Sequence, residues 1–535
     1  MIQIQGLRLR PGESEDKLPV LAAKRLRISP RAVRSWSILK KSLDARKKTD
    51  IHWRYTLGLC LREEEAVLAR CRDRTVTSYT PYRYDIPRVE PWAPPPLVVG
   101  FGPAGMFAAL VLAEAGARPV VLERGGDLEE RQAAVRRCWE TGTLDPECNV
   151  QFGEGGAGAF SDGKLATNTH DPRNGWIRQQ LHRFGAPERV LYDAKPHLGT
   201  DVLARVVRNL REHILSLGAE LRFHSAFTGF DTDAAGALVR VRGAGEEGPF
   251  ALPCRELVLA VGHSARDTVA ALYARGVPME RKPFAMGVRI EHLQSRVNIA
   301  QYGADRGDLP PAEYKGNVVL PDGRGIYTFC MCPGGYVVAA ASEPGGVVTN
   351  GMSYSGRAGV NANAAVLVSL RPEDFPGEGP LAGMRWQREI ERNCFALGGG
   401  MLFAPAQTVG DFLAGRPSTP DSAGTVRPSY RPGVVWGDLR TALPEAITAP
   451  LAQALPLLAE QGKLEFFRDA GAVLTAPETR SSSPVRIPRN EKLECPAFPG
   501  LYPCGEGAGY AGGITSAAAD GMRCAEQILK KRSGG

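Results

Sequence analysis

Apolar and polar residues alternate near the start of the chain as they do in half-buried strands. Alternation over residues 2–9, and again over 51–59, predicts two strands, because every second side chain of a strand faces the core. A helical pattern spans 17–26, and a helix-to-strand passage is expected over 33–39. These elements predict that residues 1–90 form a small α+β domain.

After a proline-rich connector at 87–96, short and wholly apolar strands alternate with a helix. Residues 97–99 and 119–122 are apolar runs, and residues 106–115 between them are helical and rich in Ala and Leu. Strands that are buried on both faces and separated by helices are typical of a doubly wound parallel sheet. Further elements are expected as a helix over 201–217 and strands over 220–223, 238–242 and 256–260.

The middle of the chain has a different character. Residues 278–489 carry many short strand-like runs and turns, with helical stretches near 384–395 and 451–460, and a helix of small residues follows over 515–521. We therefore predict an α/β fold with a discontinuous, doubly wound Rossmann-like domain, an inserted α+β substrate domain and the small N-terminal α+β domain. The predicted boundaries are 1–90 for the N-terminal domain, 91–277 with 490–535 for the Rossmann-like domain, and 278–489 for the inserted domain.

A Gly-x-Gly-x-x-Gly motif follows the first apolar strand and opens the next helix, as in dinucleotide-binding folds. Gly100 permits a tight turn, Gly102 lets the backbone approach a diphosphate, and Gly105 lets the helix pack on the strand. Glu123 lies 23 residues after Gly100 at the end of the next strand, where an acid hydrogen-bonds the adenosine ribose. The site predicted from this unit consists of Gly100, Gly102, Pro103, Ala104, Gly105, Glu123 and Arg124.

The end of the chain indicates which dinucleotide is bound. Residues 501–514 resemble the late Gly-Asp/Glu motif of two-domain FAD enzymes, and no comparable ending is needed by enzymes that bind only NAD. The resemblance implies that the acid contacts the ribityl hydroxyls and that a helix dipole points at the pyrimidine edge of the flavin. It assigns to FAD the residues Gly505, Glu506, Gly513 and Ile514.

Two more stretches resemble parts of such enzymes. Small residues in 152–165 let the main chain lie flat against a planar ring, with Ser161 or Lys164 near flavin N5; the alternative is a flexible surface loop. Residues 257–262 resemble a strand end that closes over FAD through its backbone. The two stretches add to the predicted site Gly156, Ala157, Gly158, Ser161, Asp162, Gly163, Lys164 and Gly262.

With these pieces at both ends, the whole chain resembles the uncharacterised FAD-dependent dehydrogenase family of bacteria and plastids. The resemblance implies non-covalent FAD, a GR2-like flavoprotein core and a ferredoxin-like N-terminal domain, but it implies no substrate. The stretches that carry it are residues 22–26, 41–48, 152–165, 195–201, 262–268, 282–292, 329–335 and 478–487.

Polar and nucleophilic residues near these stretches are candidates for the substrate pocket. Two cysteines form a C-x-C pair, for which we favour two small residues in a turn over a redox relay. Arginines could clamp an anionic group, or form salt bridges at the seam between domains with about equal probability. The candidates are His263, Lys282, Arg289, Cys330, Cys332, Arg480 and Arg486.

The formal charge of +8 is concentrated at the N-terminus, where residues 1–90 hold 20 Lys and Arg against 11 Asp and Glu. The basic stretch 24–48 could bind RNA, an acidic carrier protein or a dianionic substrate, or form a solvated face. Eleven Cys without a C-x-x-C pair argue against disulfides and metal sites. No signal peptide or membrane span is predicted, and we expect a cytoplasmic protein.

These observations predict an FAD-dependent oxidoreductase that transfers a hydride between flavin and a small organic substrate. No second Gly-x-Gly-x-x-Gly occurs between 184 and 495, so NAD(P)H is expected at most as a transient electron donor. Two alternatives are a flavoprotein that binds or modifies RNA through its basic domain, and an electron relay to a protein partner.

Overall fold

The computed structural model describes residues 1–167 and 169–533. Its N-terminal domain has the strand–helix–strand–strand–helix–strand order of a ferredoxin-like fold, with an antiparallel sheet in the order β2-β3-β1-β4. The pattern of apolar residues predicted the first helix and first three strands, whereas the short α2 and β4 were not predicted. The elements are β1 (Ile2–Leu9), α1 (Leu18–Leu26), β2 (Val33–Asp44), β3 (His52–Leu61), α2 (Glu64–Arg70) and β4 (Val76–Ser78).

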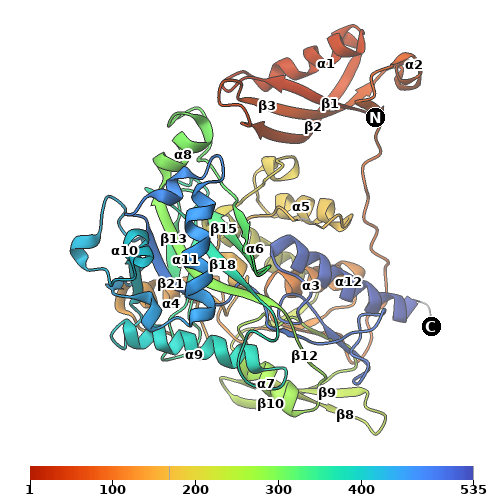
Figure 1. Cartoon of the computed structure of the whole chain (residues 1–535). Helices are drawn as coiled ribbons and strands as arrows, with labels where there is room; N and C mark the ends of the chain where they lie inside the picture. Colours follow the sequence, from red (N-terminus) through yellow and green to blue (C-terminus); the bar gives the residue numbers. More distant parts are fainter. Residues whose placement is uncertain (168, 534–535) are drawn as a thin grey trace.

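The edge strand β2 fixes this domain to the body of the protein (Figure 1). The backbone N–H of Lys41 donates to Tyr192 O at 2.8 Å, and Ala194 N–H donates to Lys41 O at 2.8 Å. Lys463 Nζ donates to Ala45 O at 2.5 Å. From β4 an extended connector runs along one side of the molecule to the next domain, as the trace in Figure 1 shows.

A five-stranded parallel sheet forms the centre of the next domain, in the order β23-β11-β5-β6-β7. Alternate residues of its strands face opposite layers: Val98 and Val121 pack under helices, whereas Leu97 and Leu122 face a small antiparallel sheet. The strands are β5 (Leu97–Val99), β6 (Val120–Leu122), β7 (Glu220–Arg222), β11 (Leu257–Leu259) and β23 (Leu501–Pro503). Since β23 comes from the end of the chain, the predicted discontinuous, doubly wound fold is confirmed.

Helices α3 and α12 cross tightly over one face of this sheet, because a side chain at Gly521 would come within 1.9 Å of Ala104 O. Three helices of this domain, α4, α5 and α7, were not predicted, and α12 extends twelve residues beyond the predicted stretch, to Ser533. The helices are α3 (Pro103–Ala115), α4 (Leu128–Thr141), α5 (Arg173–Arg183), α6 (Gly199–Ser216), α7 (Arg266–Ala274) and α12 (Ile514–Ser533). The small antiparallel sheet consists of β8 (Ala226–Thr232), β9 (Leu238–Gly245) and β10 (Gly248–Pro253).

The inserted domain is built on a seven-stranded sheet in the order β14-β15-β18-β13-β21-β19-β20. The strands are β13 (Phe284–Leu293), β14 (Asn317–Val319), β15 (Gly325–Cys332), β18 (Asn361–Leu370), β19 (Ala404–Thr408), β20 (Val434–Trp436) and β21 (Val473–Glu478), with a hairpin of β16 (Tyr336–Ala339) and β17 (Thr349–Met352) beside them. The helices are α8 (Gln294–Tyr302), α9 (Ala382–Leu397), α10 (Val409–Ala414) and α11 (Glu445–Ala459).

Two short strands, β12 (Glu280–Arg281) and β22 (Val485–Arg486), pair where the chain enters and leaves the inserted domain. The boundaries near 278 and 489 remain a prediction, and all seven strands of the large sheet lie between them. Within the described residues, the search for a helix both long and apolar enough to cross a membrane returns no candidate.

Candidate functional site

A deep cleft opens at the carboxyl ends of the parallel strands, where open α/β sheets bind their ligands. One wall is made by the loops that follow β5, β6, β11 and β23, together with residues 151–166 and the start of α12. The opposite wall comes from the inserted domain through Phe329, Cys330, Asn350, Glu478 and Arg480. The cleft therefore joins residues that lie more than four hundred positions apart in the sequence.

The three motif glycines have three different structural reasons. Gly100 has φ +94°, and a Cβ there would lie 2.4 Å from Ala260 O. A Cβ at Gly105 would lie 1.8 Å from Gly100 O, so this residue packs behind the cleft rather than lining it. Gly102 precedes the first residue of α3, and a Cβ there would meet nothing closer than Gly156 Cα at 3.5 Å. Space is thus left in front of a helix N-terminus, which suits an anionic group.

Glu123 lines the cleft and also orders the loops around it. Its Oε2 accepts a hydrogen bond from Phe101 N–H at 2.8 Å, and its Oε1 accepts from Gly125 and Gly153 N–H at 3.0 and 2.9 Å. The carboxylate retains acceptor capacity beyond these three bonds. The predicted ribose contact therefore remains a prediction.

The adjacent Arg124 also lines the cleft. Its guanidinium bonds to Glu147 and Asp267 and lies 4.3 Å from the ring centroid of Phe152. These partners hold the guanidinium in place at the rim.

The loop at 152–165 is held by hydrogen bonds, so it is not a loose surface segment. Ser161 Oγ donates to Gly158 O at 2.7 Å and accepts from Gly163 N–H at 3.0 Å. A Cβ at Gly158 would lie 3.2 Å from Ile514, which shows how closely this loop approaches the start of α12. The two stretches that the family resemblance places beside the flavin therefore lie together.

Asp162 at the floor of this loop is fully buried and is an anchor as well as a wall residue. Arg357 Nη2 donates to its Oδ2 at 2.5 Å, and the Ser353 hydroxyl also donates to it. These contacts tie the loop to the segment between β17 and β18.

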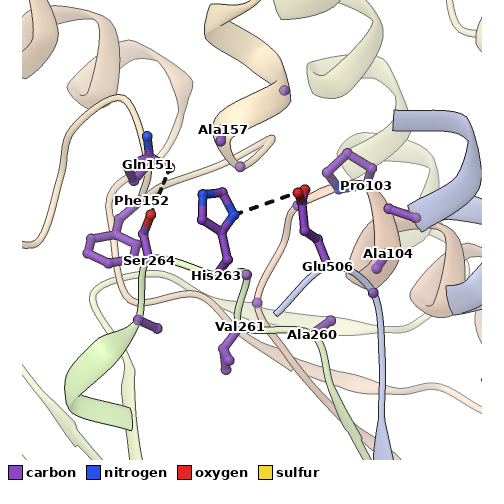
Figure 2. A pocket seen from close by; sticks show the side chains of 18 of the residues that line it. Pro103, Ala104, Gln151, Phe152, Ala157, Ala260, Val261, His263, Ser264 and Glu506 are labelled. Carbon is purple, nitrogen blue, oxygen red and sulfur yellow. Dashed lines mark hydrogen bonds and ion pairs between the residues drawn. The ribbon is translucent and has the colours of Figure 1, made fainter. Parts of the chain in front are cut away.

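His263 and Glu506 face each other across the cleft, with Nδ1 and Oε2 4.0 Å apart (Figure 2). Burial raises the pKa of Glu506 to about 8, while burial and the charges of Arg480 and Arg266 lower the pKa of His263 to about 4. At neutral pH both groups are therefore uncharged, and their contact is not an ion pair. His263 Nε2 is buried and finds no hydrogen-bond partner among the described residues.

A buried cluster of charges joins the two domains behind the cleft. Glu391 on α9 accepts from Arg480 at 3.1 and 2.9 Å and from Arg266 at 2.7 and 2.8 Å. Arg480 is a cleft residue, but its guanidinium is occupied by this pair and by Ser342. Salt bridging at the seam, one of the two predicted roles, is what the structure gives this arginine.

Two comparisons of sequence decide the family. A family model described as "FAD-dependent protein, C-terminal domain-like" matches residues 283–481, and a domain of unknown function matches residues 1–60. An uncharacterised protein of Clostridium beijerinckii is 44% identical over 537 residues, which cover 99% of each chain. The chain belongs to the predicted family of FAD-dependent oxidoreductases.

Solved structures similar to this FAD-dependent oxidoreductase include two with a named organism. A flavoprotein/dehydrogenase from Cytophaga hutchinsonii is 11% identical, with 82% of this chain and 79% of that chain covered and a TM-score of 0.37. The quinol fumarate reductase subunit FrdA of E. coli is 12% identical, with 84% and 72% covered and a TM-score of 0.38.

The seven predicted substrate residues of this FAD-dependent oxidoreductase divide into two groups. Three of them line the cleft: His263, Cys330 and Arg480. The other four do not, and the prediction that they face substrate is corrected: Lys282, Arg289, Cys332 and Arg486.

Each of the four has a different environment behind or beside the cleft. Arg289 is fully buried and Cys332 lies behind the wall. Lys282 Nζ donates to Ser483 O at 3.3 Å, and the exposed Arg486 stacks on Tyr510 at 5.5 Å. Tertiary packing, which the local sequence does not show, decides these placements.

Several cleft residues were not singled out from the sequence. Glu478, at the end of β21, is buried, and burial raises its pKa to about 7. Its Oε1 accepts from Arg289 at 3.1 Å, while its Oε2 is buried without a hydrogen-bond partner in the described chain. Ser264 Oγ donates to Gln151 Oε1 at 3.0 Å (Figure 2). Only its place at the end of an apolar run could have drawn attention to Glu478.

Proposed function

We propose that this protein transfers a hydride between FAD, held non-covalently in the cleft, and a small organic substrate bound against the inserted domain. The observation that carries the proposal is the single cleft lined by the dinucleotide motif, the C-terminal Gly-Glu motif and the inserted domain. When bound, FAD supplies a group that accepts or donates two electrons as a hydride. The chain supplies binding, orientation and protons.

The lining residues fit FAD in order along the cleft. The free N–H groups at the start of α3, behind Gly102, would hold the diphosphate, and Glu123 would face the adenosine ribose. Glu506 would contact the ribityl chain, and the start of α12 would face the pyrimidine edge of the flavin. The open space at Gly102 and the unpartnered His263 Nε2 support this fit, because each leaves room or a polar atom for a ligand.

Glu478 is our candidate for holding a proton on the substrate side. It lies on the wall made by the inserted domain, and its pKa of about 7 lets it both donate and accept a proton near neutral pH. Its unpartnered Oε2 leaves one oxygen for substrate. Glu478→Gln is expected to lower the rate of flavin reduction by substrate while FAD content stays unchanged.

The electron donor is tested by anaerobic addition of NADH and of NADPH to the purified protein while the flavin band is followed. Bleaching by one of them establishes a nicotinamide-driven reductase and supports NAD(P)H as a transient donor. A flavin that stays oxidised with both, and is bleached by no small organic substrate, would contradict hydride transfer from such molecules.

The basic N-terminal domain keeps its predicted alternatives, an RNA or an acidic protein as partner, as proposals. Part of its charge is used internally, since Arg25 pairs with Asp73 and Lys41 pairs with Glu15. Binding of tRNA to the whole protein that weakens steeply with salt would support the RNA proposal. Absence of binding at low salt would end it. An electron relay would show as flavin reduction that requires a protein fraction.

A further inference from the structure

The last strand segment before the cleft, at the end of β15, contains a β-bulge. Along the pairing with β18, Phe329 lies opposite Ala365 and Cys332 lies opposite Asn363, so β15 has one residue more than its partner. Cys330 lies in the bulge with φ +42°, a left-handed conformation that favours glycine. Bulges near active sites redirect a side chain, and here the side chain of Cys330 lines the cleft.

Two cationic side chains hold this strained turn. Arg289 Nη2 donates to Cys330 O at 2.8 Å and contacts Cys332 Sγ at 3.5 Å. Lys164, from the loop that the family resemblance places beside the flavin, donates to Met331 O. Cys332 Sγ donates to Cys330 O at 3.2 Å. The C-x-C segment is therefore fixed to both walls of the cleft.

The two thiols have opposite chemical character. The thiol of Cys332, followed by Arg289 and Lys164, lowers the pKa of Cys330, although burial acts against it. Burial raises the pKa of Cys332 well above its usual range. A partly exposed thiolate in front of a buried, protonated thiol is the arrangement in which one sulfur attacks and the other resolves.

We propose that Cys330 and Cys332 form a redox-active dithiol that exchanges an electron pair with the FAD of this cleft. The proposal rests on the proposed function and names its substrate class, a compound or protein that carries a disulfide or two thiols. When the S–S bond forms, the thiols lose two electrons and two protons. Oxidised FAD takes both electrons and one proton, and the other proton leaves to solvent. Transfer in the opposite direction reduces the disulfide, whose thiols then reduce the disulfide of the substrate by exchange through Cys330.

A second pair of buried cysteines supplies the control. Cys504 and Cys524 lie close together beside Asp520, whose carboxylate accepts from Arg489 and Arg523. Cys524 does not line the cleft. Cys524→Ser therefore breaks this pair while leaving the proposed dithiol intact.

The test is an anaerobic reductive titration of the FAD-loaded protein, with FAD content measured for every variant. The wild type and Cys524→Ser are expected to take up four electron equivalents per FAD, and Cys330→Ser and Cys332→Ser two. Cys330→Gly, which suits the left-handed backbone, replaces Cys330→Ser if the serine variant does not fold. Thiol labelling and mass spectrometry of the air-oxidised wild type should find a disulfide between residues 330 and 332.

Uptake of two equivalents by the wild type, with both thiols labelled after oxidation, would overturn the dithiol. So would a halved uptake in Cys524→Ser alone. A wild type that binds no FAD would instead overturn the proposed function, and this is seen before any cysteine is changed.

Discussion

Gly102→Ala separates the two requirements that the dinucleotide motif must meet. Gly102 has φ −80° and ψ −176°, which alanine adopts without strain, and the nearest neighbour of the new methyl is Gly156 Cα at 3.5 Å. The protein without FAD should therefore fold normally. A Gly-to-Ala change at such a position raises the free energy of unfolding by about 0.4–1 kcal/mol, because it restricts the unfolded chain.

The same methyl projects into the space where the diphosphate must approach the start of α3. If it costs one charge-assisted hydrogen bond from the backbone, the loss in FAD binding is about 1.5–3 kcal/mol. This corresponds to a dissociation constant raised by about 10- to 150-fold.

The assay is a fluorescence titration of the flavin-free protein with FAD, accompanied by thermal unfolding without FAD. Gly175→Ala is the matched control, since Gly175 is exposed in the first turn of α5 and a Cβ there meets nothing within 4 Å. It should raise stability and leave FAD affinity unchanged. Equal FAD affinity in Gly102→Ala and wild type would refute a diphosphate at this helix start.

Three further predictions concern charge. Glu391→Ala leaves Arg266 buried without its carboxylate and should lower the free energy of unfolding by about 3–5 kcal/mol in urea, whereas the exposed Glu389→Ala should not; equal values for both would contradict the cluster. The pKa of Glu506, raised by burial to about 8, makes its contribution to the stability of the FAD-free protein complete below the unfolded pKa near 4.5 and lost as pH rises through 8. Thermal unfolding of Glu506→Gln should lack this decline, and parallel pH profiles would contradict it. Alkylation of Cys330 by iodoacetamide should reach half its maximal rate below the usual thiol pKa of about 8.5, and at a higher pH in Cys332→Ser; a wild-type midpoint at or above that value would count against a thiolate.

The parts of the fold that could be predicted are those with signals over short distances in sequence. The strand before Gly100, the glycine spacing and Glu123 lie within one βαβ unit, so each local choice supports the others. Helix α4 was missed although Asp127 and Glu130 form a capping box at its start. Its polar surface hides the weak apolar periodicity.

The far wall of the cleft could not be predicted, because it depends on contacts between distant residues. Glu391 lies on a helix 125 positions from Arg266, and nothing in the local sequence indicates that the two meet. The bulge at Cys330 depends on the register of β15 against β18, so the C-x-C pair looked like an ordinary turn.

The absorbance spectrum of the purified protein, recorded before and after denaturation, tests the central claim most directly. The account predicts a flavin spectrum with about one FAD per chain, and release of that FAD into the supernatant when the protein is denatured, because it is held without a covalent bond. A colourless protein that also fails to bind added FAD would contradict the account.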